Sequence, residues 1–519
     1  MTDASPGTAT QTPAPVRPKE RVLIISAALL ALFLGALDAL VMSAAMPTII
    51  AELGGLSLYA WVYSAYLLAR AVSLPVFGKL SDLFAVKQLM LVAIALFTVA
   101  SAAAGAAPSM GFLVAARVFQ GIGAGGIFAL VYVVLSDVAL PGQRGKVLSL
   151  ASSVWGISSV IGPTLGGVVV TYFSWRWIFY MNLPLGLLSL AGIGLFFREL
   201  REKPGHADLD LAGITCFSSM VLAGLTLVMT GGREIPWDSL HGVALGLVTL
   251  VAGAGFIYFE RRATDPFLNF AFFRDPGFAL GNAMTFGASF AIFCLFAYAP
   301  LFLQGVLSKS PMVVGYAMLS LSLGWSLGSL AMGRFVDGFG AKKASLAGAL
   351  LMACGAVFCL GFGRETALAF FFPVFIVIGL GMGFVSLSTL LIVQDSVGPE
   401  DLGMATSIHQ FARTFGGTVG VGVCGGVVTT RLFNGLEKAG PALSAALPEN
   451  MTGDMMTRLR ESMAHMFQPE FQARIPADAV AILQGAVLDG VWAAFAIVAL
   501  VSIVGLGLGM FLPPDRGRS

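Results

Sequence analysis

The stretch GKLSDLFAVK, residues 78–87, has a near copy in GRFVDGFGAK, residues 333–342. Each stretch directly follows a hydrophobic run, and each combines glycine, an acid and lysine in the same order. The two copies are 255 residues apart, which is about half the length of the chain. A short polar sequence that recurs at the same place in two apolar halves predicts an internal repeat.

The composition is that of a membrane protein. Of the 519 residues, 57% are hydrophobic and 11% are charged, and the mean hydropathy is +0.87. Soluble domains carry about 25% charged residues, because charge is needed on a surface that faces water. Apolar runs of about 18 or more residues recur along the chain, and each is long enough to cross a bilayer core. We therefore predict an all-α polytopic membrane protein.

Windows of about 19 residues predict fourteen membrane-spanning helices. The repeat relates the first span to the ninth and the fifth to the thirteenth, so spans one to six and nine to fourteen form two parallel six-helix bundles. A second pair of similar stretches, DVALPGQRGK from Asp137 and DSVGPEDLGM from Asp395, supports this relation. Spans seven and eight are then an inserted pair. The expected spans are 22–46, 59–80, 89–108, 111–136, 147–172, 178–198, 211–231, 241–259, 277–303, 313–333, 344–363, 368–394, 404–430 and 486–512.

The predicted domains follow from these spans. Two six-helix bundles with a binding site between them are the architecture of alternating-access transporters. We expect a disordered cytoplasmic tail at 1–20, an N-terminal six-helix bundle at 21–200, two inserted transmembrane helices at 201–262, a C-terminal six-helix bundle at 263–512 that includes an extracytoplasmic loop at 432–485, and a cytoplasmic tail at 513–519.

The distribution of lysine and arginine predicts the orientation. Basic residues are frequent in one set of alternate segments and sparse in the intervening loops, where Arg176, Arg233, Lys309 and Arg364 lie. Because cytoplasmic loops carry the excess of basic residues, both termini are expected to be cytoplasmic.

Several other functions have no support in the sequence. Gly121, Gly123 and Gly126 spell G-x-G-x-x-G, but no strand precedes them and the run is predicted to be transmembrane. No G-x-x-x-x-G-K-[ST] loop occurs, so ATP is not an expected partner. The five cysteines lie in apolar runs, which predicts packed thiols rather than disulfides or a metal site. The four histidines are scattered and the net charge is +2, so neither an enzyme nor a nucleic-acid-binding protein is expected, and no cofactor.

Several stretches resemble the major facilitator superfamily, in its fourteen-helix drug:proton antiporter branch (EmrB/QacA type). Residues 78–87 are similar to the family's loop G-x-L-x-D-R-x-G-R-K, although Leu83 and Val86 replace its two arginines. The resemblance runs from about residue 22 to residue 512 and implies the major facilitator fold. Further motifs resemble those of helices one, four, five and six of this branch: LDALVMSAAMP from Leu37, RVFQGIGAGG from Arg117, GISSVIGPTLGG from Gly156 and WRWIFYMNLPLG from Trp175.

The repeated polar stretch is expected to be a conformational latch. Glycine lets two helices approach closely, and an acid can accept hydrogen bonds from the N terminus of a neighbouring helix. The resemblance implies that Gly78, Asp82, Gly333 and Asp337 hold the two bundles together on the cytoplasmic side in the outward-facing state. The alternative is a pair of polar turns that only obey the distribution of basic residues.

The glycine-rich motif of the fifth span has a mechanical interpretation. Pro163 weakens the helix locally, and Gly162, Gly166 and Gly167 allow tight contact with a facing helix, as does Gly156. The resemblance links this antiporter motif to sealing and bending of the fifth helix. The alternative is an ordinary interface of small residues.

Four ionisable residues are predicted to lie deep in the membrane: Asp38, Arg70, Arg117 and Arg413. A charge at the bilayer centre costs about 2.5–3.5 kcal/mol on the insertion scale and marks a functional candidate. Judged by depth along their helices, Asp38 can meet Arg117, Arg70 or both. The resemblance implies that Asp38 carries the coupled proton and that Arg117 adjusts its affinity for that proton. A static ion pair is the alternative.

The candidate substrate cavity includes Arg70, Tyr66, Gln120, Arg413 and His409. Three deep cations against one deep acid predict a preference for anionic or neutral amphiphiles. For Arg413 an equal alternative is that it only orients neighbouring helices. For His409, one turn earlier, the alternative is a role in packing.

Together these features predict a proton-coupled antiporter that exports lipophilic compounds or drugs across the inner membrane of a bacterium. The expected partners are a lipophilic substrate, protons and the lipid bilayer, and a periplasmic adaptor protein is a further candidate. Two other functions stay open: a lipid or fatty-acid exporter on the same scaffold, and a proton symporter that imports organic anions.

Overall fold

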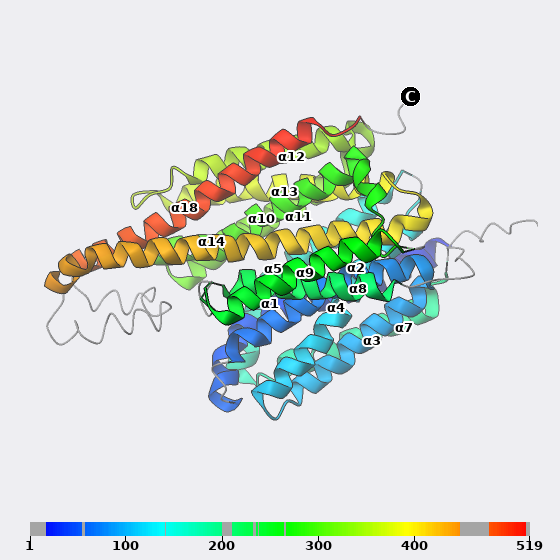
Figure 1. Ribbon diagram of the computed structural model, residues 1–519, viewed down its shortest axis with the longest axis horizontal. Helices are drawn as coiled ribbons and strands as arrows, with labels where there is room; N and C mark the ends of the chain where they lie inside the picture. Colours follow the sequence, from blue (N-terminus) through cyan, green and yellow to red (C-terminus); the bar gives the residue numbers. More distant parts are fainter. Residues whose placement is uncertain are drawn as a thin grey trace, which may run out of the picture.

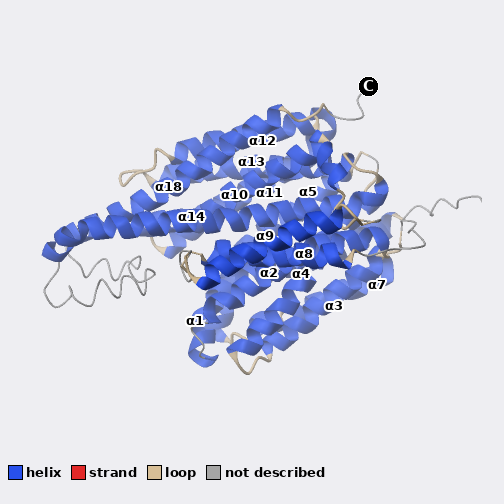
Figure 2. Ribbon diagram, in the orientation of Figure 1, coloured by secondary structure: helices blue, strands red, loops and turns tan. Residues whose placement is uncertain are grey.

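In the computed structural model every regular element is a helix among the residues that the structure describes (Figure 2). Those residues are 17–53, 58–140, 142–199, 210–231, 235–236, 238–263, 266–446 and 477–514. The all-α class and the long apolar helices predicted from the sequence are confirmed.

The helices follow the predicted spans in order along the chain. The short α6 and the adjoining α7 together occupy the sixth predicted span. The helices are α1 (Pro18–Leu53), α2 (Tyr59–Leu83), α3 (Val86–Gly105), α4 (Met110–Val138), α5 (Arg144–Tyr172), α6 (Trp177–Tyr180), α7 (Asn182–Phe196), α8 (Leu211–Thr230), α9 (Leu240–Glu260), η2 (Phe270–Arg274), α10 (Pro276–Gly305), α11 (Pro311–Phe339), α12 (Ala341–Cys359), η3 (Leu368–Phe370), α13 (Phe371–Asp395), η4 (Pro399–Asp401), α14 (Leu402–Ala446) and α18 (Ala477–Met510).

Twelve helices in the described part of the chain are long and apolar enough to cross a membrane. Helices α2 and α5, which occupy the second and fifth predicted spans, have 25 and 29 residues but are not among the twelve. Helix α2 carries Arg70, Lys79 and Asp82, which lower its hydropathy, and several side chains of α5 lie outside the described residues. The count of fourteen spans therefore stays a prediction.

Two predicted boundaries differ from the structure. Helix α1 begins at Pro18, inside the predicted tail, while residues 1–16 lie outside the described residues. Helix α14 continues to Ala446 and α18 begins at Ala477, so both ends of the predicted loop 432–485 are helical. These ends are rich in alanine and leucine, which favour helix. The middle of that loop, 447–476, and the last five residues also lie outside the described residues.

The long helices pack in two groups (Figure 1). In the first, α1 contacts α4, α5 and α7, and α4 lies against α2 and α3. In the second, α10 contacts α13, α14 and α18, and α13 lies against α11 and α12. The two groups meet where α5 packs on α11 and where α2 packs on α14. The sequence repeat relates the α5–α11 contact to the α2–α14 contact. The predicted domain boundaries stay a prediction.

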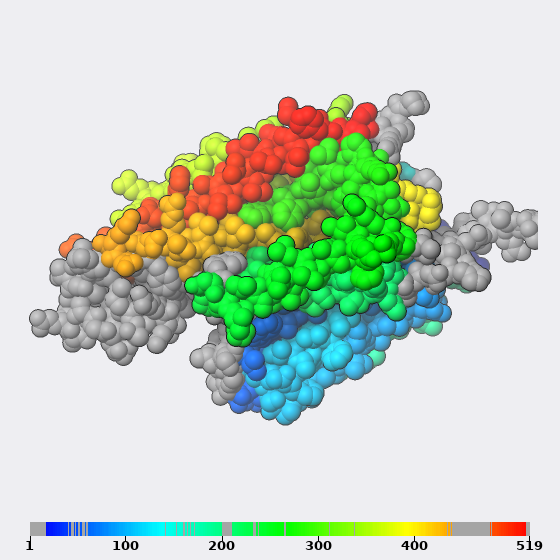
Figure 3. Space-filling model, viewed as in Figure 1, coloured from blue at the N-terminus to red at the C-terminus, as the bar shows by residue number. Residues whose placement is uncertain are grey.

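Helices α8 and α9, which the sequence predicts to be an inserted pair, lie on the outside of the junction between the two groups. They pack on each other, and α8 also contacts α2 and α14. Figures 1 and 3 show them in green between the blue N-terminal helices and the orange and red C-terminal ones. Only 11% of the most apolar 18-residue stretch of α9 is buried, and Leu240, Leu247 and Leu250 are exposed. So large an apolar surface suits contact with lipid.

The C-terminal end of α1 is tied to the segment that precedes α6. The Glu52 carboxylate accepts a hydrogen bond from the Trp175 indole (2.7 Å) and forms an ion pair with Arg176. Arg176 also donates to the carbonyl oxygen of Ala107, just after α3 (3.2 Å). The hydrogen bond from Trp175, and then that from Arg176, hold the pKa of Glu52 below its ordinary value.

This link predicts a small pH-dependent contribution to stability. Because the pKa of Glu52 is lowered on folding, its stabilising effect is present above the ordinary carboxyl range near 4.5 and is lost as the pH falls through the lowered pKa. The Glu52→Gln variant should have a lower melting temperature than wild type at pH 7, and the difference should shrink below about pH 4. Thermal unfolding across this pH range measures it. A difference that stays constant with pH would contradict the assignment.

Candidate functional site

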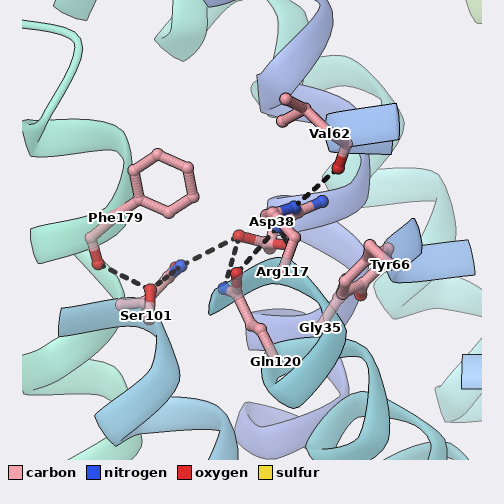
Figure 4. Close-up of polar contacts among 9 residues, drawn as sticks. Gly35, Asp38, Val62, Tyr66, Ser101, Arg117, Gln120 and Phe179 are labelled. Atoms are coloured by element: carbon pink, nitrogen blue, oxygen red, sulfur yellow. Dashed lines mark hydrogen bonds and ion pairs between the residues drawn. The ribbon is translucent and has the colours of Figure 1, made fainter. Parts of the chain in front are cut away.

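A buried acid lies at the centre of the N-terminal group of helices. Asp38 of α1 is 1% exposed, and Arg117 and Gln120 of α4 are 0% exposed. Nη1 of Arg117 lies 2.6 Å from Oδ2 of Asp38 and 2.8 Å from Oε1 of Gln120, while Nε2 of Gln120 donates to Oδ1 of Asp38 (2.8 Å). Three side chains thus form a closed set of hydrogen bonds (Figure 4).

The helical register explains this arrangement. Arg117 and Gln120 are three residues apart on α4, so both side chains emerge on the same face and reach the same carboxylate. Nε of Arg117 also donates to the carbonyl oxygen of Val62 on α2 (3.3 Å). The structure therefore brings the predicted acid and the predicted arginine of the fourth span into direct contact, and it adds Gln120 to the pair.

Two members of this network, Asn182 and Ser101, were not predicted from the sequence. Nδ2 of Asn182, the first residue of α7, donates to Oδ1 of Asp38 (3.2 Å) and to Oγ of Ser101 on α3 (3.0 Å). Ser101 in turn donates to the carbonyl oxygen of Phe179 (2.9 Å). The sequence feature that could have pointed to Asn182 is its place in WRWIFYMNLPLG, where it is a polar residue next to an apolar run. In the same motif, Trp175 makes the contact with the end of α1 described above.

Tyr66 of α2 connects this network with a second arginine. The Cζ atom of Arg117 lies 4.1 Å from the centroid of the Tyr66 ring, and the Tyr66 hydroxyl donates to the carbonyl oxygen of Gly35 (3.3 Å). Arg70, one turn further along α2, has its Cζ atom 5.7 Å from the same ring. One aromatic ring therefore contacts both cations.

A cavity of about 530 Å³ lies between the two groups of helices. Its lining comes from α1, α2, α4 and α5 on one side and from α10, α11 and α14 on the other, with Met229 of the inserted α8. A cavity of this volume with aromatic walls suits a drug-sized ligand. The aromatic lining residues are Tyr63, Phe128, Trp155, Phe293, Phe296 and Trp325.

Arg70 and Arg413 are the ionisable cations that line this cavity in the described part of the chain. They flank one aromatic pair, because Arg70 Cζ is 5.1 Å from the Phe128 centroid and Arg413 Cζ is 5.8 Å from that of Trp155. The Phe128 and Trp155 centroids are 5.4 Å apart. Arg413 also donates to the hydroxyl of Tyr132 (3.4 Å). Of the two partners that the sequence left open for Asp38, the structure pairs it with the arginine of α4.

The other three residues expected at the cavity lie behind its lining. Tyr66 and Gln120 belong to the Asp38 network. His409 of α14 is 0% exposed, and its Nε2 lies 2.8 Å from the Thr285 hydroxyl and 3.0 Å from the Thr389 hydroxyl. The imidazole thus joins α14 to α10 and α13 rather than facing the cavity.

The first polar stretch of the repeat ends α2 and lies against the start of α14. Oδ1 of Asp82 accepts a hydrogen bond from the amide of Gly403 (2.8 Å), and Oδ2 accepts one from Met404 (2.7 Å). The first amides of a helix lack partners within it and favour a negative charge. A Cβ at Gly78 would overlap Ser407, so glycine is required at this contact.

The second copy makes the related contact at the end of α11. A Cβ at Gly333 would lie 2.5 Å from Oγ of Ser149 and 2.8 Å from the carbonyl oxygen of Gly145, both on α5. Nearby, Arg144 pairs with Asp395 across the two groups (3.2 Å). The side chain of Asp337 lies outside the described residues. Both glycine contacts join the two groups, and their role as a latch stays a prediction.

The glycine-rich motif of α5 also packs against the other group. A Cβ at Gly156 would overlap Ser326 of α11, and Gly162 and Gly166 are buried. The side-chain surroundings of Pro163 and Gly167 lie outside the described part of the chain. Close packing of α5 on α11 is therefore present at Gly156, whereas bending of α5 stays a prediction.

Comparison with known proteins places the chain in one family. The family model described as Major Facilitator Superfamily matches residues 28–421. Multidrug transporter protein MdtP of Bacillus subtilis (strain 168) is 31% identical over 508 residues, which cover 96% of this chain and 94% of that protein. Multidrug resistance protein 3 of the same organism is 30% identical over 419 residues, which cover 80% and 81%.

Two solved structures share the fold. The proton:xylose symporter XylE bound to 6-bromo-6-deoxy-D-glucose has a TM-score of 0.61 at 15% identity, covering 96% of this chain and 98% of that chain. The human organic anion transporter MFSD10 (TETRAN) has a TM-score of 0.59 at 14% identity, covering 95% and 100%. At such low identity the similarity concerns the fold alone.

The contact at Gly333 predicts a position-specific effect of a single methyl group. The Gly333→Ala variant should separate α11 from α5 and destabilise the protein by about 1–3 kcal/mol, as overpacking does. The matched control is Gly338→Ala in the same repeat copy, where a Cβ would meet open space. Thermal unfolding and transport rate of both variants measure the difference. Equal effects at the two positions would contradict the contact.

The hydrogen bond from Asn182 predicts that its loss destabilises the Asp38 network. In Asn182→Leu the carboxylate loses one of its buried donors, and we expect a cost of about 1–3 kcal/mol. Asn282→Leu is the matched control, because Asn282 is also buried and donates to an uncharged acceptor, the Phe278 carbonyl oxygen of its own helix (2.8 Å). Thermal unfolding should show the larger decrease for Asn182→Leu, and a larger decrease in the control would refute the assignment.

Proposed function

The chain belongs to the Major Facilitator Superfamily, and we propose that it is a proton-coupled antiporter that exports lipophilic compounds across a bacterial inner membrane. The relatives named as multidrug transporters support the export of drug-like compounds. The single observation that carries the proposal is the buried Asp38–Arg117 pair, which lies next to an aromatic cavity and outside its lining. Such a position lets one acid exchange protons without being part of the substrate surface.

The coupling step follows from the hydrogen bonds of Asp38. When Asp38 is ionised, Arg117, Gln120 and Asn182 all donate to it and hold α1, α4 and α7 together. A proton on the carboxylate removes the charge that these donors share, and the ion pair with Arg117 weakens. Because Arg117 contacts Tyr66, and Tyr66 contacts Arg70, the change reaches the cavity wall through one aromatic ring.

The proposed topology completes the mechanism. It has fourteen spans in two six-helix bundles and an inserted pair, with both termini cytoplasmic. The contacts of Gly78, Asp82 and Gly333 then form the latch on the cytoplasmic side. An adaptor protein would be needed where a second membrane must be crossed.

The proton gradient supplies enough energy for export. One proton crossing a potential of about 100 mV releases about 2.3 kcal/mol. A difference of one pH unit adds about 1.4 kcal/mol. Together these sustain a gradient of roughly several hundredfold for a neutral substrate.

A symporter that imports organic anions is the second candidate function. The observation that favours it is the pair Arg70 and Arg413 in the cavity lining. The direction of the driving gradient separates the two functions. Antiport accumulates substrate in vesicles that are acidic inside, whereas symport requires acid outside.

The test uses purified full-length protein in vesicles with an imposed pH gradient and a fluorescent lipophilic probe. Wild type should accumulate the probe when the interior is acidic, and Asp38→Asn should lose at least about 90% of this gradient-driven uptake, because the variant has no titratable group at the pair. Exchange of probe for probe without a gradient should persist in the variant.

Two controls make this experiment decisive. The Glu365→Gln variant removes an exposed acid remote from the pair and should behave as wild type. Vesicles without protein correct for passive movement of the probe. Full gradient-driven uptake by Asp38→Asn would move the coupling site elsewhere, and accumulation only with acid outside would replace antiport with symport.

A further inference from the structure

We propose that the substrate of this transporter is a lipophilic organic acid whose acidic head group binds Arg70 in the central cavity. The inference rests on the proposed function, since it takes the cavity between the two groups of helices as the transport site. It goes beyond that function by naming the chemical class of the substrate and the residue that recognises its charge.

The charge balance of the cavity points to an anion. Neither aspartate nor glutamate occurs among the described residues that line it, whereas Arg70 and Arg413 both do. Arg117 is already neutralised by Asp38 at 2.6 Å, behind the cavity wall. In the described part of the chain neither Arg70 nor Arg413 forms an ion pair. A cationic substrate would therefore meet two like charges and no counterion.

The unsatisfied polar atoms of the cavity point the same way. Nε and Nη1 of Arg70 are buried and have no hydrogen-bond partner, and the same is true of Nε1 of Trp155 and Nε1 of Trp325. Among the described lining residues, every buried side-chain group without a partner is thus a donor. Burying unpaired donors is costly, and a ligand acceptor atom that reaches one of them through a small shift of the wall removes that cost. A carboxylate offers two oxygens to the planar guanidinium.

Arg70 is held where it can act on a ligand. It is 8% exposed, and its Cζ atom lies 5.1 Å from the Phe128 ring and 5.7 Å from the Tyr66 ring. Contact of a cation with aromatic rings holds the guanidinium in place without using its N–H groups. Nε and Nη1 of Arg70 therefore stay unpaired, while Nε and Nη1 of Arg117 are directed to Val62, Asp38 and Gln120.

The rest of the cavity suits the apolar part of such an acid. Phe293 and Phe296 of α10 and Trp325 of α11 line it, and Met229 of α8 adds an adaptable thioether. A molecule with an acidic group at Arg70 and an apolar body against these rings matches both the charge and the walls. The fit is for organic acids of drug size rather than for small hydrophilic anions.

The test compares three probes with one aromatic body: pyrenebutanoate, its methyl ester and pyrenebutylamine. Binding to the full-length protein in nanodiscs is measured by fluorescence, with empty nanodiscs subtracted. We expect the acid to bind about 10- to 100-fold more tightly than the ester and the amine to bind most weakly, as expected for hydrogen bonds to a charged group.

Variants of Arg70 locate the site. Arg70→Gln should abolish the preference of acid over ester, while the ester binds both proteins equally and thereby shows that the cavity is intact. Arg70→Lys keeps the charge and should retain part of the preference. Arg262→Gln is the matched control, because Arg262 lies over the Tyr258 ring on α9, away from the cavity.

The outcomes separate this inference from the proposed function. Equal binding of acid and ester by wild type, or an unchanged preference in Arg70→Gln, overturns the inference and leaves export of lipophilic compounds in place. Gradient-driven accumulation of the ester or the amine but not of the acid also overturns it. Failure of wild type to bind or transport any of the three probes overturns both.

Discussion

The negative charge of Asp38 is the constraint on which the N-terminal group of helices depends. A carboxylate that is 1% exposed, in helices surrounded by lipid, is tolerable only with partners, because burial of an unpaired charge costs several kcal/mol. Arg117 and Gln120 come from α4, Asn182 from α7, and Ser101 of α3 holds the asparagine. Four helices are thereby placed around one pair of oxygens. A proton added to that carboxylate removes the charge to which the donors of the neighbouring helices bind.

The two glycine contacts between the helix groups show how a repeat diverges while keeping its geometry. At Gly78 and Gly333 the chain can place α2 on α14 and α11 on α5 only because no Cβ intervenes. The turns that follow differ: Gly340 adopts a φ of +90°, which favours glycine, whereas Ala85 at the corresponding position has a φ of −60°. The helix packing is therefore retained more closely than the turn. The first turn, which has alanine at this position, adopts another conformation while the glycine contact at Gly78 is present.

The helical class and the order of the helices could be predicted from the sequence, because the length of each apolar run and the spacing of its apolar residues can be read from the chain alone. The contact between Asp38 and Arg117 was also accessible, since the depth of a residue in a span follows from helical rise. The part played by Asn182 was not, because it depends on how α7 is rotated against α1. Nor could the sequence place His409, which lies at a helical interface with Thr285 and Thr389 rather than at the cavity. The paired placement of Arg70 and Arg413 on one aromatic pair likewise depends on the packing of α2, α4, α5 and α14.

Helix α8 makes the two flanks of the molecule unequal. It packs on α2 and α14, and its Met229 lines the cavity, so this flank is closed by a helix that faces lipid on its other side. No inserted helix packs extensively on α5 and α11 in the described part of the chain. For a compound dissolved in one leaflet of the bilayer, sideways entry between α2 and α14 is barred by the α8–α9 hairpin. On the α5–α11 flank the barrier is instead the direct packing of those two helices, including the close contact of Gly156 with Ser326, so the two flanks of the cavity are closed in different ways.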